Sequence, residues 1–255
     1  MTAAPFIRVE NLRKVFKVGG KPFIAVQDVS LEISEGELVS IVGPSGCGKS
    51  TILSILASLL EADEGKVDIG NSASPFTPGR DIGMVFQKAL LLKWRTILDN
   101  VLLPAEILGL PRREAVDRAR DLIRMVGLEK FSDAYPQQLS GGMQQRAAIA
   151  RALVHDPKLI LMDEPFGALD ALTRERMNLE LLRIWRESRK TILFVTHGIQ
   201  EAVFLGSQVA VMTAGPARMA AQFKIDLPEP RTIDVKTTEK FGAYTREIYQ
   251  LLGLR

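Results

Sequence analysis

Residues 43–51 read Gly-Pro-Ser-Gly-Cys-Gly-Lys-Ser-Thr and fit the pattern G-x-x-x-x-G-K-[ST]. The apolar run Val39–Val42 directly before them predicts a short strand, and Lys49–Leu60 predicts the helix that follows. A glycine-rich turn between a strand and a helix presents backbone N–H groups and the positive end of the helix dipole to an anion. The stretch therefore predicts a phosphate-binding loop in an α/β protein. The alternative is a glycine-rich turn that merely joins two elements.

The residue types of this loop suit a nucleotide. Three glycines let the backbone wrap a phosphate, and Lys49 can reach the β- and γ-phosphates. Ser50 offers a hydroxyl to Mg²⁺, a cation that prefers octahedral oxygen ligands. Cys47 is expected only to fill a position that requires a small residue, with no redox role. The predicted nucleotide-binding residues of the loop are Gly43, Pro44, Ser45, Gly46, Cys47, Gly48, Lys49, Ser50 and Thr51.

A pair of acidic residues follows a second apolar run. Leu159–Met162 predicts a buried strand, and Asp163 and Glu164 come directly after it. Ligands of open α/β sheets bind at the carboxyl ends of the strands, so both carboxylates are expected to face the phosphates. Asp163 suits the Mg²⁺ shell, and Glu164 suits the role of polarising the attacking water. A solvated acidic strand end is the alternative.

The remaining pattern predicts a largely parallel sheet with an antiparallel flap before it. Short β-branched runs, among them Ile82–Phe86 and Thr191–Val195, alternate with longer amphipathic runs, which is typical of βαβ units. Phe6–Val9 and Val26–Ile33 predict small strands around Gly19-Gly20. The strand that ends at Thr196 is followed by His197, which can hydrogen-bond a γ-phosphate or a water. His155, beside an Asp-Pro pair, is interpreted as structural.

Helical patterns interrupt the β pattern in one long segment. Residues 93–156 predict an inserted helical subdomain, in which Thr96 and Asp99 form the start of a capping box. A terminal helix is expected at about residues 237–252. We expect one domain over residues 1–255, because a chain of this length can bury a large single core.

Composition limits the classes of function and location. Lys plus Arg number 33 and Asp plus Glu 30, a net charge of +3 that does not indicate a nucleic-acid partner. The single cysteine excludes an internal disulfide and a cysteine-based zinc cluster, which is typical of a reducing compartment. No apolar run approaches the roughly 20 residues that cross a bilayer, and Met1–Arg8 lacks a signal-peptide pattern. A cytoplasmic location is expected, with any membrane role supplied by a partner.

Residues 139–146, Leu-Ser-Gly-Gly-Met-Gln-Gln-Arg, resemble the LSGGQ signature of ABC ATPases. The resemblance covers about Phe6 to Met212. It implies an α/β P-loop NTPase fold with a RecA-like core, an N-terminal antiparallel β subdomain and an inserted α-helical subdomain. It also implies ATP and Mg²⁺ as cofactors, and ATP hydrolysis coupled to transport. In the family the signature meets the ATP held by the opposite subunit, so a second copy or a paralogous ATPase subunit is expected as a partner.

The resemblance also implies roles for single residues. Phe16 is similar to the aromatic residue that stacks on adenine, with a core phenylalanine as the alternative. Gln87 resembles the Q-loop glutamine that links the Mg²⁺ site to the helical insertion, and Asp170 the D-loop aspartate at the subunit contact. His197 matches the switch histidine, which makes it, with Glu164, a predicted catalytic residue. The signature residues expected to contact nucleotide are Ser140, Gly141, Gly142 and Gln144.

The segment Ala89–Val101 resembles the corresponding part of importers for nitrate, sulfonates and taurine. In that subfamily a proline usually precedes the tryptophan, whereas Lys93 precedes Trp94 here. Ala89–Trp94 is an apolar stretch on which transmembrane permease subunits are expected to dock, with ordinary packing as the alternative. This resemblance implies a peripheral location on the cytoplasmic face of the inner membrane and an indirect connection to a solute-binding protein.

Three other functions share part of this pattern. An exporter or lipid-transport ATPase would carry the same ATP residues with a different docking surface. A non-transport ABC protein acting on DNA or ribosomes typically shows tandem ATPase domains, coiled-coil insertions or zinc motifs. A soluble P-loop kinase would lack the Leu-Ser-Gly-Gly helix start.

Overall fold

The computed structural model describes residues 4–70, 76–213 and 215–254, and the chain divides into two compact units. The first unit comprises Met1–Phe76 and Leu182–Arg255, and the second comprises Thr77–Leu181. Helix α6 (Ala171–Ser188) contains the boundary between Leu181 and Leu182. Within the described residues no helix has both the length and the apolar character needed to span a membrane.

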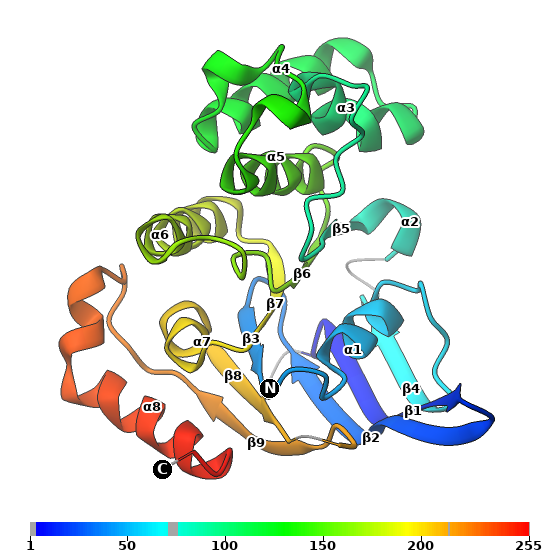
Figure 1. Cartoon of the computed structure of the whole chain (residues 1–255), viewed down its shortest axis with the longest axis vertical. Helices are drawn as coiled ribbons and strands as arrows, with labels where there is room; N and C mark the ends of the chain where they lie inside the picture. Colours follow the sequence, from blue (N-terminus) through cyan, green and yellow to red (C-terminus); the bar gives the residue numbers. More distant parts are fainter. Residues whose placement is uncertain (1–3, 71–75, 214, 255) are drawn as a thin grey trace. The chain divides into compact units, whose positions relative to one another are not determined.

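An antiparallel sheet opens the first unit, in the order β2-β1-β4 (Figure 1). Strands β1 (Ile7–Val18) and β2 (Lys21–Ile33) form a hairpin across Gly19-Gly20, whose φ values of 56° and 79° suit a two-residue turn. These strands are longer than the sequence predicted, because the half-exposed end of the hairpin lacks a clear apolar alternation. Strand β4 (Glu64–Ile69) was not predicted, since four of its six residues are polar or glycine.

Parallel strands form the core of the first unit, in the order β7-β3-β8, with β9 antiparallel to β8. Strands β3 (Leu38–Val42) and β7 (Thr191–Thr196) are buried along their whole length, as expected for strands covered on both faces. Helix α1 ends at Leu56, before the predicted Leu60, where Ser58 adopts a left-handed φ of 58°. The other elements of this unit are α1 (Lys49–Leu56), α7 (Ile199–Leu205), β8 (Gln208–Met212), β9 (Met219–Lys224), η3 (Ile233–Thr237) and α8 (Glu239–Leu251).

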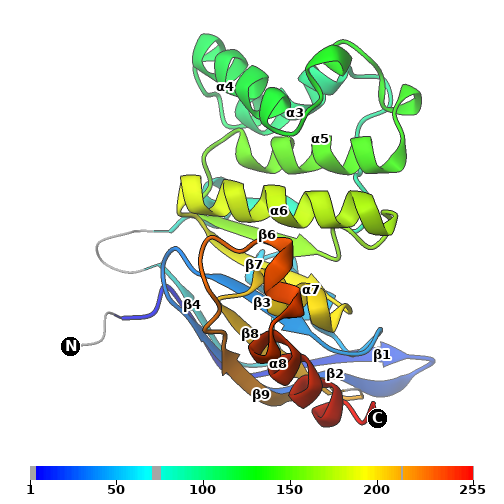
Figure 2. The ribbon, with the colours of Figure 1, turned by 90° about the vertical axis from the view of Figure 1, so that its left-hand side faces the viewer.

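Helices dominate the second unit (Figure 2). Its two strands, β5 (Ile82–Val85) and β6 (Leu159–Asp163), pair in parallel. Thr96 caps helix α3, since its Oγ1 accepts the Asp99 N–H at 3.1 Å and donates to the Asp99 carboxylate at 2.7 Å. The helical elements are α2 (Pro78–Asp81), α3 (Ile97–Ile107), α4 (Arg112–Met125), η1 (Glu129–Phe131), η2 (Pro136–Gln138) and α5 (Gly141–Leu153).

Candidate nucleotide-binding site

The predicted phosphate loop joins β3 to α1 and lies against the backbone of two other strands. A Cβ on Gly48 would lie 2.7 Å from the carbonyl oxygen of Ala25 on β2, and one on Gly43 would lie 2.6 Å from that of Met212 on β8. Gly46 and Gly48 have φ values of 74° and 107°, a region that side chains disfavour. Glycine is therefore required by close approach at two positions and by backbone conformation at two.

Lys49 begins helix α1 and holds the loop in a tight curve. Its side chain is only 4% exposed, and Nζ donates to the carbonyls of Gly43 at 2.8 Å and Pro44 at 2.9 Å. The helix has no acidic residue in its first turn and no side-chain cap from Gly48, so its dipole favours an anion at this end. Cys47 is 2% exposed within the loop, in keeping with a small buried residue.

Phe16 lies on the hairpin outside the buried core. It is half-buried on β1 opposite Phe23, with the ammonium of Lys14 5.8 Å from the centre of its ring. Strand β2 carries both Phe23 and Ala25, the residue whose carbonyl contacts Gly48. Phe16 therefore lies on the same hairpin as the strand that contacts the phosphate loop.

The acidic pair ends strand β6 in the second unit. Asp163 is the last residue of β6, and Glu164 has a left-handed φ of 44°, a strained conformation for a residue with a side chain. Gln87, which follows β5, places its Nε2 3.5 Å from Glu164 Oε2. Since β5 and β6 are parallel neighbours, their carboxyl ends bring the glutamine and the carboxylate together.

The signature residues form the start of helix α5. Ser140 is the N-cap, and its Oγ accepts the N–H of Met143 at 3.3 Å. Gly141 is exposed at the first turn, and a Cβ on Gly142 would lie 3.0 Å from a methyl group of Leu169. Gln144 donates its amide to the carbonyls of the preceding turn, at Pro136 (2.9 Å) and Leu139 (3.2 Å). The Gln144 amide nitrogen thus holds the turn that precedes helix α5. The motif alone does not predict this contact.

Two further side chains of α5, missed by sequence reasoning, hold the segment that contains Gln87. Gln145 donates to the carbonyl of Phe86 at 2.9 Å, and the Arg151 guanidinium donates to the carbonyls of Ala89 and Leu90 at 2.8 Å each. Burial lowers the pKa of Arg151. Gln145 is only 5% exposed, but its burial is evident from the structure and not from the sequence pattern.

Asp170 and His155 make local contacts in the second unit. Asp170 accepts the N–H of Thr173 at 3.0 Å and caps the start of α6, and hydrogen bonding from Thr173 lowers its pKa. The Nε2–H of His155 donates to the carbonyl of Ile82 at 2.9 Å, and burial lowers the pKa of this imidazole. These contacts support the structural interpretation of His155.

His197 follows strand β7 in the first unit and is exposed between two residues that are fixed by hydrogen bonds. The Thr196 hydroxyl donates to a carboxylate oxygen of Glu201 at 2.5 Å, and it accepts the N–H of Gly198 at 2.9 Å. Glu201 belongs to the first turn of α7. The backbone on both sides of His197 is therefore tied to that helix.

The oxygen donors predicted for Mg²⁺ come from both units. Ser50 belongs to the first unit, and Gln87 and Asp163 belong to the second. Among the described residues no group of three or more His, Cys, Asp or Glu side chains could hold a metal ion by itself. A serine hydroxyl, a glutamine amide and an aspartate carboxylate are each oxygen donors of the kind that Mg²⁺ accepts beside phosphates and water.

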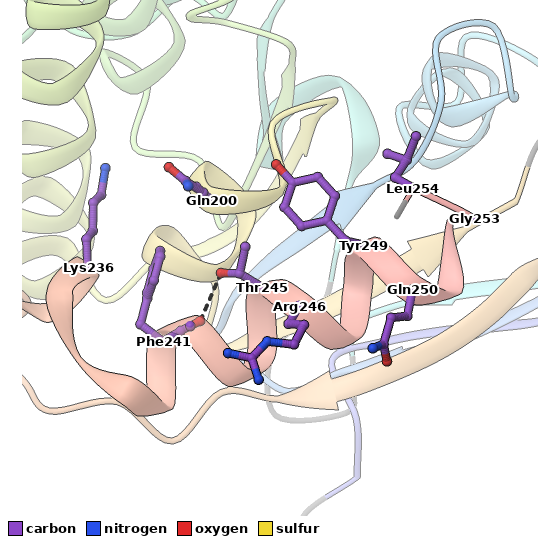
Figure 3. A pocket seen from close by; sticks show the side chains of 10 residues that line it. Gln200, Lys236, Phe241, Thr245, Arg246, Tyr249, Gln250, Gly253 and Leu254 are labelled. Carbon is purple, nitrogen blue, oxygen red and sulfur yellow. Dashed lines mark hydrogen bonds between the residues drawn. The ribbon is translucent and has the colours of Figure 1, made fainter.

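A hollow of about 1110 Å³ lies elsewhere in the first unit, lined by α7, η3 and α8 (Figure 3). Gln200, Lys236 and Tyr249 are among its lining residues, and none of the predicted nucleotide-binding residues lines it. It is therefore a feature separate from the phosphate loop.

Comparisons with known proteins identify the family. A family model described as ABC transporter matches residues 26–167. An uncharacterized ABC transporter ATP-binding protein of Methanocaldococcus jannaschii is 48% identical over 96% of this chain and 91% of its own length. A taurine import ATP-binding protein of Rhizobium johnstonii is 44% identical over 91% of this chain and 90% of its own length.

Solved structures agree with these sequence matches. A dimeric ATP-binding cassette, solved in a post-hydrolysis state with ADP and Pi bound, matches with a TM-score of 0.76 and 37% identity, over 86% of this chain and 99% of its own. The predicted resemblance and the predicted α/β P-loop fold class are thereby confirmed. The chain belongs to the ABC transporter family and is one of its ATPase cassettes.

Proposed function

We propose that this protein is the ATP-binding and ATP-hydrolysing subunit of an ABC importer for a small anion or sulfonate-like solute of the nitrate, sulfonate and taurine class. The observation that carries the solute class is the 44% identity, over 91% of the chain, to a taurine import ATP-binding protein. The resemblance of Ala89–Val101 to importers of this class supports the same proposal.

The phosphate loop and Phe16 bind the nucleotide in this proposal. The N–H groups at the start of α1 and the Lys49 ammonium hold the phosphates, since they supply the positive end of a helix dipole and a positive charge. Phe16 stacks on the adenine, for which its half-buried position on the hairpin leaves ring surface accessible. The remaining loop residues, Pro44, Ser45 and Thr51, contribute backbone contacts and the start of the helix.

Hydrolysis is assigned to residues at the strand ends. Glu164 accepts a hydrogen bond from the attacking water and orients it, with Gln87 orienting the carboxylate. His197 hydrogen-bonds the γ-phosphate or the water. Ser50, Gln87 and Asp163 would hold Mg²⁺, which when bound neutralises charge on the phosphate oxygens.

A second ATPase subunit, either another copy or a paralogue, completes each site. Ser140, Gly141, Gly142 and Gln144 contact the ATP held by the opposite subunit, and Asp170 contributes to the subunit contact. The exposed start of α5 suits this role, because an N-terminus capped only by a neutral serine attracts an anion. The related cassette bound to ADP and Pi is dimeric, which supports the proposal.

Transmembrane permease subunits are the proposed partners at the segment after Gln87. Leu90 and Trp94 are 57% and 74% exposed, an apolar surface that docking would cover. Arg151 of helix α5 holds the backbone of this segment by hydrogen bonds. A movement of the segment would therefore be transmitted to α5. The protein would thus lie peripherally on the cytoplasmic face of the inner membrane, with a solute-binding protein as an indirect partner.

Solute uptake in a deletion strain tests this function. Loss of the gene is expected to reduce uptake of radiolabelled taurine, an alkanesulfonate or nitrate. The wild-type gene should restore uptake, and a Glu164→Gln variant expressed at the same level should not. Undiminished uptake of all three solutes would contradict the proposed solute class, while the ATPase assignment would be judged separately on purified protein.

A further inference from the structure

A buried arginine in the C-terminal part of the first unit forms hydrogen bonds at the end of helix α7. Arg231 is only 4% exposed, and its Nη1 donates to the carbonyls of Phe204 and Gly206 at 2.8 Å and of Val203 at 3.3 Å. The last carbonyls of a helix have no partner within the helix, so a buried helix end needs a donor of this kind. Arg231 therefore acts as the cap of α7.

Further contacts fix this cap in place. Arg231 Nε forms an ion pair with Glu229 at 2.9 Å, and the Lys236 ammonium lies 4.5 Å from the centre of the Phe204 ring. The Arg231 guanidinium thus lies at the C-terminal end of a short helix, where the helix dipole favours positive charge. Removal of the guanidinium would leave several buried carbonyls without their donor.

The opposite end of α7 fixes the surroundings of His197. Glu201 in the first turn of α7 accepts the Thr196 hydroxyl, and that hydroxyl accepts the Gly198 N–H. His197 lies between these two residues in the chain. Helix α7 has only seven residues, so its two ends are about 10 Å apart and a displacement at one end reaches the other.

Helix α7 borders the hollow with one residue and is otherwise largely buried. Gln200 of α7 borders the hollow, with Tyr249 of α8 and Lys236 also lining it (Figure 3). Most of α7 is packed, since Ile199, Ala202, Val203, Phe204 and Leu205 are at most 5% exposed. A packed helix transmits strain along its length, so the hydrogen bonds of Arg231 at one end bear on the other.

We propose that Arg231 is a positioning residue for ATP hydrolysis, which acts through α7 and the Thr196–Glu201 contact to hold His197 in its working position. This inference rests on the proposed role of His197. It assigns the segment after β9 a part in turnover, in addition to its part in folding.

Steady-state ATPase kinetics of the purified full-length chain test the proposal. Arg231→Met, similar in length and uncharged, is expected to lower kcat about ten- to hundredfold while the KM for ATP changes less than about twofold. Arg231→Lys keeps the charge without the forked geometry and should recover part of kcat. Trp185→Phe is the matched control, because it removes a 2.8 Å hydrogen bond to the Gly36 carbonyl in the same unit without touching α7. If Trp185→Phe lowers the Tm as much as Arg231→Met does, it should still keep the kcat of the wild type.

A double variant separates this proposal from the role of His197. If Arg231 acts through His197, then Arg231→Met should lower kcat little further in a His197→Ala background. A His197→Ala variant with normal kcat would overturn the role of His197. If His197→Ala lowers kcat but Arg231→Met does not, only the role of Arg231 is overturned. The same holds if the two losses of kcat multiply in the double variant. If Arg231→Met does not fold, Arg231→Lys and Glu201→Gln are each combined with His197→Ala instead. The same comparison of kcat values then decides the outcome.

Discussion

The amide Nε2 of Gln87 lies 3.5 Å from the carboxylate Oε2 of Glu164. The distance is at the upper limit for a hydrogen bond, so the contact can be exchanged for another partner at little cost. Glu164 also adopts a left-handed backbone conformation, with φ of 44°, directly after the last residue of β6. A carboxylate on a strained backbone, beside an amide that can change partner, is suited to orienting a water molecule.

Glu164→Gln is expected to keep ATP binding and to lower the rate of hydrolysis by about two to four orders of magnitude, since the amide cannot act as a general base. Because ATP then persists between paired subunits, the variant should form a stable dimer with ATP, whereas the wild-type chain without nucleotide should be monomeric. Light scattering with and without ATP, together with a phosphate-release assay, measures both effects. A normal rate of hydrolysis in this variant would remove Glu164 from the mechanism.

Gly48→Ala and Gly46→Ala form a matched pair that tests the packing of the phosphate loop. An added Cβ at Gly48 would lie 2.7 Å from the Ala25 carbonyl oxygen, whereas one at Gly46 would meet nothing within 4 Å. Both positions have positive φ, so both variants carry backbone strain, and only Gly48→Ala adds a collision with β2. Gly48→Ala should therefore lose more in Tm and in ATP affinity. Equal losses would mean that backbone conformation alone requires glycine here.

Features encoded by adjacent residues could be predicted from the sequence. The phosphate loop, the acidic pair at the end of β6 and the turn at Gly19-Gly20 each depend on neighbouring residue types, and each lies at the element where it was expected. Contacts between distant segments could not be predicted in this way. Gln145 and Arg151 donate to backbone carbonyls about 60 positions earlier in the chain. Every residue has a backbone carbonyl, so the sequence cannot show which one accepts the bond.

The docking segment can be tested without disturbing the fold. Trp94 is 74% exposed, so Trp94→Ala should leave the Tm and the ATPase rate of the isolated chain nearly unchanged. Large aromatic residues often dominate interfaces, so the variant should bind its permease about 2 kcal/mol more weakly. Val18→Ala, which shortens a 63% exposed side chain on the hairpin, is the control. Co-purification with the permease measures the difference, and equal recovery of both variants would place the docking surface elsewhere.

Acid should destabilise the protein through His155. Its Nε2–H donates to the Ile82 carbonyl, and its buried Nδ1 has no hydrogen-bond partner among the described residues. Burial lowers the pKa of His155 below its ordinary value of 6.5, and the nearby positive charge of Arg118 lowers it further. The hydrogen bond to the Ile82 carbonyl and the charges of Asp156 and Asp81 oppose the shift only in part. As pH falls below about 6.5 the unfolded chain binds a proton that the folded chain resists, so stability is lost in that range and is fully present above it.

His155→Gln isolates this contribution, since glutamine can still donate to the Ile82 carbonyl but does not titrate. The free energy of unfolding of the wild type should fall more than that of the variant between about pH 7.5 and 5.5. Urea denaturation at several pH values measures both curves, and the carboxylates common to the two proteins cancel in the difference. Parallel curves would show that His155 has the same pKa in the folded and unfolded chain, contrary to a buried neutral imidazole.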